Sequence, residues 1–135
     1  MKSESGLLHH ETTRRIIGGF FETHHELGSG FLESVYKNAL AIVLRGDGLR
    51  VEREVPFDVG FRGESVGIYK ADMIVERKIV VEVKTGRLID PAHVAQVRNY
   101  LRASELQVGL LLNFGPSAEF KRLVATADGN VRVTA

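Results

Sequence analysis

The sequence contains no cysteine among its 135 residues, which excludes disulfide bonds and thiolate metal sites. Its longest apolar stretch, residues 108–114, falls far short of the roughly 20 residues that a membrane-spanning helix needs. The polar N-terminus MKSESGLLHHETT has no apolar core of signal-peptide length. These absences predict a cytoplasmic protein that makes no membrane contact.

An excess of one charge is also missing, because 18 Lys and Arg residues stand against 17 Asp and Glu residues, for a formal net charge of +1. Nucleic-acid contacts would therefore come from local patches rather than from the chain as a whole. We find no internal repeat, low-complexity segment or linker. The length suits one domain with a sizeable core, so we expect a loose lead-in over residues 1–10 and a single domain over residues 11–135.

Hydrophobic periodicity predicts an α/β fold, in which a small mixed sheet is flanked by helices. The strand expected near residue 106 follows a helix that itself follows a strand, so these two strands should run parallel through a right-handed crossover. Helices are expected over residues 11–27, 31–45, 91–103 and 120–124, and strands over residues 49–61, 65–75, 79–84, 106–114 and 131–134.

Capping and turn residues support several of these boundaries. Thr12 or Thr13 can cap the first helix, and Asp90 can cap the helix that begins at Pro91. Pro56 indicates an edge strand or a bulge, because proline cannot donate a backbone hydrogen bond. On the second helix, one apolar stripe and one mixed stripe lie side by side; the first holds Leu32, Val35, Ala39 and Ile42, and the second holds Glu33, Tyr36 and Leu40.

The segment YKADMIVERKIVVEVKTG, residues 69–86, is typical of two strands joined by a polar turn. Its second strand is β-branched and apolar, yet it carries Glu82 and Lys84 on one face, where both are costly to bury without a partner. A three-residue connection over residues 76–78 would pair Asp72 directly with Glu82, whereas a two-residue loop would turn Asp72 to the other face. Two opposed carboxylates indicate a cation between them.

The second helix opens with GFLESVY, residues 30–36, which spells G-x-x-E-x-x-Y around Glu33. Glu33 could also pair with Lys37, one turn later, on a solvated face. Just upstream, His24 and His25 lie near the end of the first helix, where a histidine interacts favourably with the helix dipole. We expect neither histidine to be a direct metal ligand.

Together, the hairpin and the G-x-x-E-x-x-Y stretch resemble the GxxExxY branch of the PD-(D/E)XK nuclease superfamily. In that pattern an Asp on one strand and an acidic-x-Lys on the next form a metal-dependent phosphodiesterase site. The resemblance covers nearly the whole chain after the first dozen residues. It implies a restriction-endonuclease-like core and hydrolysis of the phosphodiester bonds of DNA or RNA.

The resemblance also implies a role for each site residue. Hard oxygen ligands suit Mg²⁺ or Mn²⁺ better than zinc. Lys84 would orient the attacking water or stabilise charge on the phosphate. The implied metal ligands are Glu33, Asp72, Glu82 and the Val83 carbonyl, and Tyr36, Gln96 and Tyr100 would support the site or bind the substrate.

Two other classes of function stay open. One is a non-catalytic nucleic-acid-binding or protein-interaction module that keeps the nuclease fold, and the other is a different metal-dependent hydrolase that uses the same carboxylates. A binding module has no use for a buried acidic pair, which favours an enzyme. The expected partner is nucleic acid, DNA rather than RNA, with the chain acting as a monomer or a homodimer.

Overall fold

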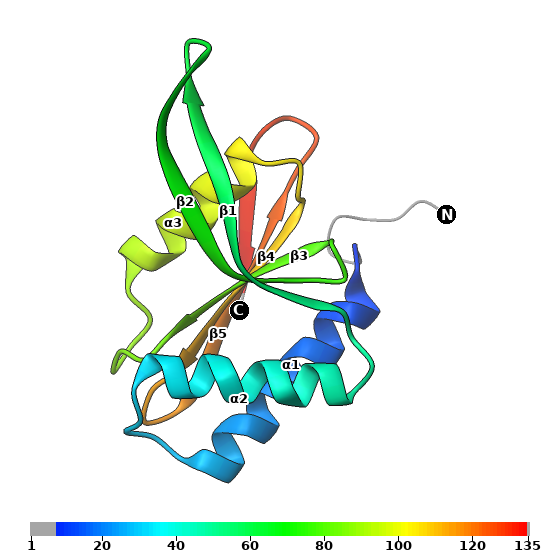
Figure 1. Ribbon diagram of the computed structural model, residues 1–135, viewed down its shortest axis with the longest axis vertical. Coiled ribbons are helices and arrows are strands. Elements are labelled where there is room, and N and C mark those ends of the chain that lie inside the picture. Colours follow the sequence, from blue (N-terminus) through cyan, green and yellow to red (C-terminus); the bar gives the residue numbers. More distant parts are fainter. Residues whose placement is uncertain (1–7, 135) are drawn as a thin grey trace.

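The computed structural model describes residues 8–134, so most of the expected lead-in lies outside the described residues. Within them the chain forms three helices and six strands (Figure 1). The helices are α1 (His10–Leu27), α2 (Glu33–Gly46) and α3 (Pro91–Ala103). The strands are β1 (Val51–Phe61), β2 (Glu64–Val75), β3 (Ile79–Lys84), β4 (Val108–Phe114), β5 (Ala118–Ala125) and β6 (Val131–Thr134). None of these helices is long and apolar enough to cross a membrane.

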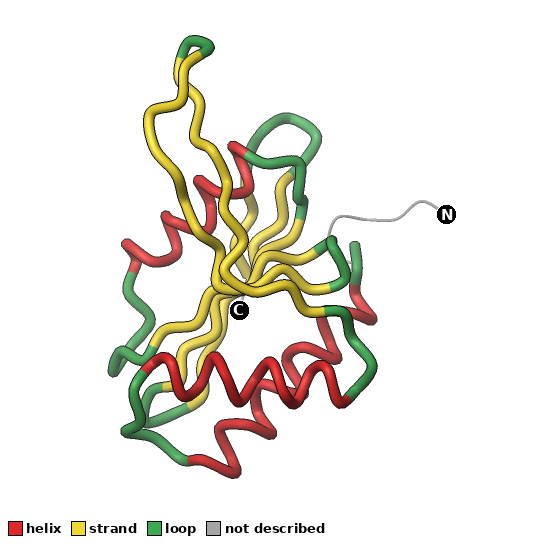
Figure 2. The backbone as a smooth tube through the Cα atoms, viewed as in Figure 1, coloured by secondary structure: helices red, strands yellow, loops and turns green. Residues whose placement is uncertain are grey.

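All six strands belong to one sheet, in the order β1-β2-β3-β4-β5-β6. Of these six strands, only β3 and β4 pair in parallel, with α3 between them in the chain, and this confirms the predicted mixed sheet and the predicted parallel pair. Helices α1 and α2 pack on one face of the sheet and α3 packs on the other (Figures 1 and 2). Alternate residues of β3 divide between the two cores: Val81 faces α1 and α2, whereas Val80 faces α3.

The predicted short helix over residues 120–124 is wrong, because these residues lie within β5. This strand pairs with β4 in antiparallel register from Val108–Val124 to Phe114–Ala118. Its side chains alternate between the two cores, with Val124 on the α1–α2 side and Leu123 on the α3 side. A five-residue segment has too few residues to distinguish a helical period from a strand period, so pairing with the neighbouring strand decides the structure.

Helix α2 buries the mixed stripe rather than the apolar one. Tyr36 and Leu40 are fully buried, whereas Leu32 and Ile42 are 76% and 72% exposed. The ring of Tyr36 stacks on Phe114 of β4 with a centroid distance of 4.5 Å, which turns this stripe toward the sheet. Of the two stripes noted in the sequence, the one with Tyr36 and Leu40 therefore faces the core.

The helix starts confirm one predicted cap and contradict another. The Asp90 carboxylate accepts a hydrogen bond from the Ala92 N–H at 2.8 Å and caps α3 as predicted. Helix α1 instead has His9 at its N-cap, in the left-handed conformation and without a side-chain hydrogen bond, so neither Thr12 nor Thr13 caps it. Both threonines lie inside the first turn of α1.

Strands β1 and β2 form a long hairpin that projects beyond the rest of the sheet (Figures 1 and 2). Pro56 lies in β1, at the edge of the sheet, as its missing N–H predicts. Strand β2 pairs with β3 only from Met73 to Val75. The hairpin therefore leaves the central sheet at Asp72, one of the predicted site residues.

Candidate active site

The register of the central hairpin is the predicted one. Three residue pairs, from Met73–Val81 to Val75–Ile79, leave residues 76–78 as the three-residue connection. Continued by one step, this register sets Asp72 opposite Glu82. Both acids are buried, with 8% and 4% of their surface exposed. The sequence therefore correctly predicts a buried pair of carboxylates on adjacent strands.

Where β2 separates from β3, the carboxylates of Asp72 and Glu82 replace backbone carbonyls as hydrogen-bond acceptors. The Asp72 N–H donates to Glu82 Oε2 at 3.0 Å, and the Val83 N–H donates to Asp72 Oδ2 at 2.8 Å. Buried N–H groups need acceptors, and here strand β2 separates from β3 so that no carbonyl serves. These hydrogen bonds fix both side chains, and they leave Asp72 Oδ1 and Glu82 Oε1 for other partners.

Strand β2 changes the face that it presents at Asp72. Met73 packs in the α1–α2 core, whereas Ala71 and Tyr69 pack in or against the α3 core. On β1, the residue between the pairs Arg53–Met73 and Val55–Ala71 is Glu54, which has a φ of 51°. Such a φ is uncommon for a residue other than glycine and marks a local irregularity of the strand. Asp72 consequently contacts both Lys37, on the α1–α2 side of the sheet, and Glu82, on the α3 side.

On the α2 side, the cation that contacts Asp72 is Lys37. Its Nζ lies 2.9 Å from Asp72 Oδ1, 3.4 Å from Glu33 Oε2 and 3.9 Å from Glu54 Oε2. Burial alone would lower the pKa of Lys37, but the hydrogen bond and charge of Asp72, together with Glu33 and Glu54, raise it overall. The Glu33–Lys37 pair considered from the sequence is thus present, and the same lysine also reaches two strands.

The three predicted carboxylate ligands are not gathered around one point. Among residues 8–134, no group of three or more His, Cys, Asp or Glu side chains is close enough together to hold a metal ion. Glu33 meets Asp72 through Lys37, and Glu82 lies on the other side of Asp72. The side-chain donors are hard oxygens, which is the ligand type that hard divalent ions prefer, and those of Asp72 and Glu33 are paired with the Lys37 ammonium.

The electrostatics of Glu82 are set by burial. Burial and then the charge of Asp72 raise the pKa of Glu82 to about 7, against opposing effects of the hydrogen bond from the Asp72 N–H and, more weakly, of the Lys84 charge. Burial and the charge of Glu82 also raise the pKa values of Tyr69 and Tyr100. The Tyr69 hydroxyl is buried and makes no well-aligned hydrogen bond within the described part of the chain. Tyr69 and Tyr100, with rings 5.2 Å apart, thus form a low-dielectric wall beside Glu82.

Glu82 should make the stability of the metal-free protein depend on pH. Its pKa is about 7 in the folded chain and 4.5 ordinarily, so the folded state binds this proton more tightly. The stabilisation is complete below about pH 4.5 and is lost as the pH rises through about 7. We expect the free energy of unfolding to fall by about 3 kcal/mol across this window.

Urea unfolding in the presence of a chelator, at a series of pH values, measures this effect. Glu82→Gln keeps an oxygen that can accept from the Asp72 N–H but cannot titrate, so it serves as the matched control. The difference between the two stability curves isolates Glu82 from the histidines. A difference that does not change between pH 5 and pH 8 would contradict the raised pKa.

The structure gives Tyr36 a role inside the protein rather than at a substrate surface. The ring is fully buried, and its hydroxyl donates to the Gly28 carbonyl at 2.5 Å and accepts from the Phe31 N–H at 3.3 Å. These bonds hold the turn that leads into Glu33. Tyr36 therefore supports the site by fixing this turn, and direct contact with a substrate, as considered from the sequence, does not fit its burial.

The other predicted supporting residues lie on or near α3. Tyr100 is 5% exposed and packs against Tyr69, while Gln96, one turn earlier, is exposed to solvent. Lys84 follows Glu82 on β3 and is partly exposed. His24 Nε2 lies 2.9 Å from the Gly115 carbonyl, a hydrogen bond that occupies this nitrogen. That neither His24 nor His25 binds a metal directly stays a prediction.

Sequence reasoning missed two further residues of the site region. Tyr69 lies three residues before Asp72, and the change of face at Asp72, which no sequence pattern reveals, brings it beside Glu82. Asn113, paired with Lys84 in the parallel register, bonds both backbone groups of Gly86, at 3.0 and 2.8 Å, and so fixes the chain after Lys84. A lone Asn in the apolar run of residues 108–114 was the available signal for the second.

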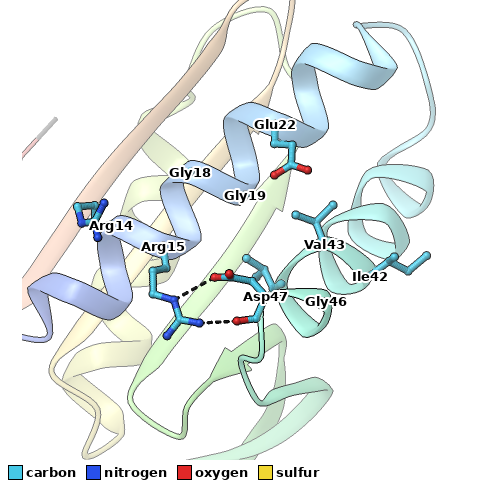
Figure 3. A pocket seen from close by; sticks show the side chains of 10 residues that line it. Arg14, Arg15, Gly18, Gly19, Glu22, Ile42, Val43, Gly46 and Asp47 are labelled. Atoms are coloured by element: carbon cyan, nitrogen blue, oxygen red, sulfur yellow. Dashed lines mark hydrogen bonds and ion pairs between the residues drawn. The ribbon is translucent and has the colours of Figure 1, made fainter.

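A groove of about 600 Å³ between α1 and α2 is separate from this site (Figure 3). The Arg15 guanidinium pairs with Asp47 across it at 2.9 Å. Its lining includes Glu22 and Ile42 but none of the carboxylates described above. The groove therefore adds no group to the Asp72–Glu82 pair.

Comparison with known proteins identifies a matching family and a similar solved structure. Residues 10–123 match the model of the PD-(D/E)XK nuclease superfamily. No curated protein matches the chain. Among solved structures, the chain is similar to the crystal structure of SSO0001, with a TM-score of 0.54 and 26% sequence identity. The match covers 72% of this chain and 52% of that one, so the chain spans about half the length of SSO0001.

Proposed function

This chain belongs to the PD-(D/E)XK nuclease superfamily, and from that membership we propose that it is a metal-dependent nuclease that hydrolyses phosphodiester bonds. The observation that carries the proposal is the buried Asp72–Glu82 pair, held at the point where β2 leaves β3. Lys84 follows on the same strand, in the acid-x-Lys spacing of the superfamily. The restriction-endonuclease-like fold supplies the strand pair on which these residues are mounted.

In this proposal Asp72, Glu82 and Glu33 hold one Mg²⁺ or Mn²⁺ ion together with the Val83 carbonyl. Such an ion, when bound, polarises the scissile phosphate and lowers the pKa of a bound water. The ionised form of Glu82 is the one that ligates, so its buried position favours a cation as partner. Asp72 keeps its hydrogen bond from the Val83 N–H, which holds the carboxylate in orientation.

The proposed role of Lys84 is to stabilise negative charge that develops on the phosphate. No ion pair within residues 8–134 engages its ammonium, and its partly exposed position leaves it accessible to a substrate. Gln96 and Tyr100 lie one turn apart on α3, and the charge of Glu82 adds to burial in raising the pKa of Tyr100. We assign Gln96, which is exposed, to positioning of the nucleic-acid strand, and the buried Tyr100 to supporting the site beside Glu82.

Cleavage of labelled nucleic acids tests the proposed function. The purified protein is incubated with single- and double-stranded DNA and RNA in Mg²⁺, in Mn²⁺ or in chelator. We expect cleavage only with a divalent ion, and we expect DNA to be the better substrate. Glu82→Gln is the control, because it removes a ligand charge from a buried position. Equal cleavage by this variant would reveal a contaminating nuclease, and no cleavage of any substrate would contradict the proposal.

One observation favours the non-catalytic alternative. In the metal-free protein, the Lys37 ammonium neutralises Asp72 and Glu33, so the acids have a structural partner without any metal. A module of this kind would bind nucleic acid equally well with divalent ions or with chelator. Its affinity for nucleic acid would also be unchanged in Glu82→Gln, and it would cleave no substrate. The nuclease would cleave only with a divalent ion.

A further inference from the structure

We propose that Lys37 is a displaceable internal cation, which fills the carboxylate site in the metal-free protein and sets the concentration of divalent ion that the site needs. This inference rests on the metal site of the proposed function. It adds a residue that neither the acid-x-Lys spacing nor the family match assigns. Lys37 is a positioning residue in this account, because it acts on the carboxylates rather than on the substrate.

Three carboxylates from three different elements surround the Lys37 ammonium. Asp72 belongs to β2, Glu33 to α2 and Glu54 to β1, and their oxygens lie 2.9, 3.4 and 3.9 Å from Nζ. The Lys37 side chain is 18% exposed, so solvent screens these contacts less than on an open surface. Only Asp72 is a hydrogen-bond acceptor of the ammonium, while Glu33 and Glu54 act on it through their charge. The lysine therefore does in the metal-free protein what a bound cation would do.

Competition between lysine and metal follows from the use of the Asp72 oxygens. Oδ2 already accepts from the Val83 N–H at 2.8 Å, whereas Oδ1 contacts Lys37 at 2.9 Å. Oδ1 is the Asp72 oxygen that no backbone N–H occupies, so it is the better placed of the two to bind an ion. An ion on either oxygen would lie close to the Lys37 ammonium, and two like charges at that distance repel. We therefore expect the ammonium to move away when the ion binds.

The lysine side chain is able to make this movement. Its stem has four carbons and rotates freely, and its strongly hydrated ammonium gains contact with water when it swings outward. Helix α2, which carries Lys37, does not need to shift. The carboxylates stay in place because Asp72 and Glu82 are fixed by backbone N–H groups rather than by the lysine. Metal binding would therefore exchange one cation for another beside Asp72 and Glu33, and Glu82 would join as a ligand from the other side of Asp72.

Calorimetric titration with Mn²⁺, without nucleic acid, measures this exchange. Lys37→Met removes the competing charge and keeps most of the stem. We expect its dissociation constant for Mn²⁺ to fall at least about tenfold, the change in an equilibrium constant that corresponds to one pKa unit. Lys37→Arg keeps the charge and should bind like the wild type. The control is Lys78→Met, which removes an exposed lysine from the β2–β3 turn and should leave the affinity unchanged.

Thermal unfolding supplies a second readout. Without metal, Lys37→Met should melt at a lower temperature than the wild type, because its acids lose their counter-ion, and Mn²⁺ should restore most of the loss. Lys37→Gln, which can still hydrogen-bond to Asp72, replaces Lys37→Met in both measurements if the methionine variant does not fold.

The outcomes separate this inference from the proposed function. If the Lys37→Met variant is folded but binds Mn²⁺ no more tightly than the wild type does, the inference is overturned and the nuclease proposal stands. If only Lys37→Met binds the ion, the competition is supported, and the wild type is instead a protein in which lysine has replaced the metal. If neither binds Mn²⁺, both proposals fail.

Discussion

Asp72→Asn is expected to lower metal-dependent cleavage at least about a thousandfold while the protein stays folded. The ion supplies several kcal/mol of transition-state stabilisation, and each 1.4 kcal/mol corresponds to a factor of ten in rate. The substitution removes the charge that Asp72 would offer to the ion. It keeps the shape of the side chain and an oxygen that can accept from the Val83 N–H, so the strand junction is preserved.

Single-turnover cleavage with Mn²⁺, with folding verified by circular dichroism, measures this loss. Asp58→Asn provides the matched control, because Asp58 is an exposed acid on the same hairpin whose carboxylate accepts from Ser65. That variant should cleave like the wild type. A folded Asp72→Asn variant with cleavage within a few-fold of the wild type would remove Asp72 from the metal site.

Lys84→Met is expected to lower cleavage by about a hundredfold or more, the scale for removal of one electrostatic group at a transition state. The methionine keeps the stem and removes the charge. A buried structural counter-ion to Glu82 would instead cost about 3–5 kcal/mol of stability when lost. Lys84 is partly exposed and its ammonium makes no described ion pair, so we expect a stability loss below about 1 kcal/mol.

The two roles of Lys84 are separated by measuring three quantities in the same variant. Urea unfolding gives the stability, fluorescence anisotropy with Ca²⁺ gives the affinity for labelled DNA, and saturating substrate gives kcat. We expect a large fall in kcat with little change in the other two quantities. A large loss of stability that Mn²⁺ partly restores, with kcat unchanged, would show that Lys84 is only a counter-ion.

The paired acids could be predicted because their positions depend on local rules. The alternation of side chains along β3 sets Glu82 on a defined face, and the three-residue connection over residues 76–78 fixes the register that brings Asp72 opposite to it. The N-cap at Asp90 follows from the adjoining Pro91, and the parallel β3–β4 pair follows from the order strand, helix, strand along the chain. Where neighbouring residues in the sequence determine the geometry, the sequence was sufficient.

The remaining features depend on contacts between distant elements. Lys37 pairs with Glu33 by helical spacing, but its contact with Asp72 requires the placement of α2 against β2, which no spacing encodes. The choice between the two stripes of α2 has the same origin, since stacking of Tyr36 on Phe114 decides which face is buried. Residues 120–124 form a strand because β4 offers them an edge.

A crystal structure of the protein soaked in Mn²⁺ tests the central claim most directly, because anomalous scattering locates the ion without reference to activity. We expect one ion bonded to Asp72 and Glu82, with the Lys37 ammonium moved away from Asp72 Oδ1. Millimolar Mn²⁺ with no ion at these carboxylates, and with Lys37 still paired to Asp72, would contradict it.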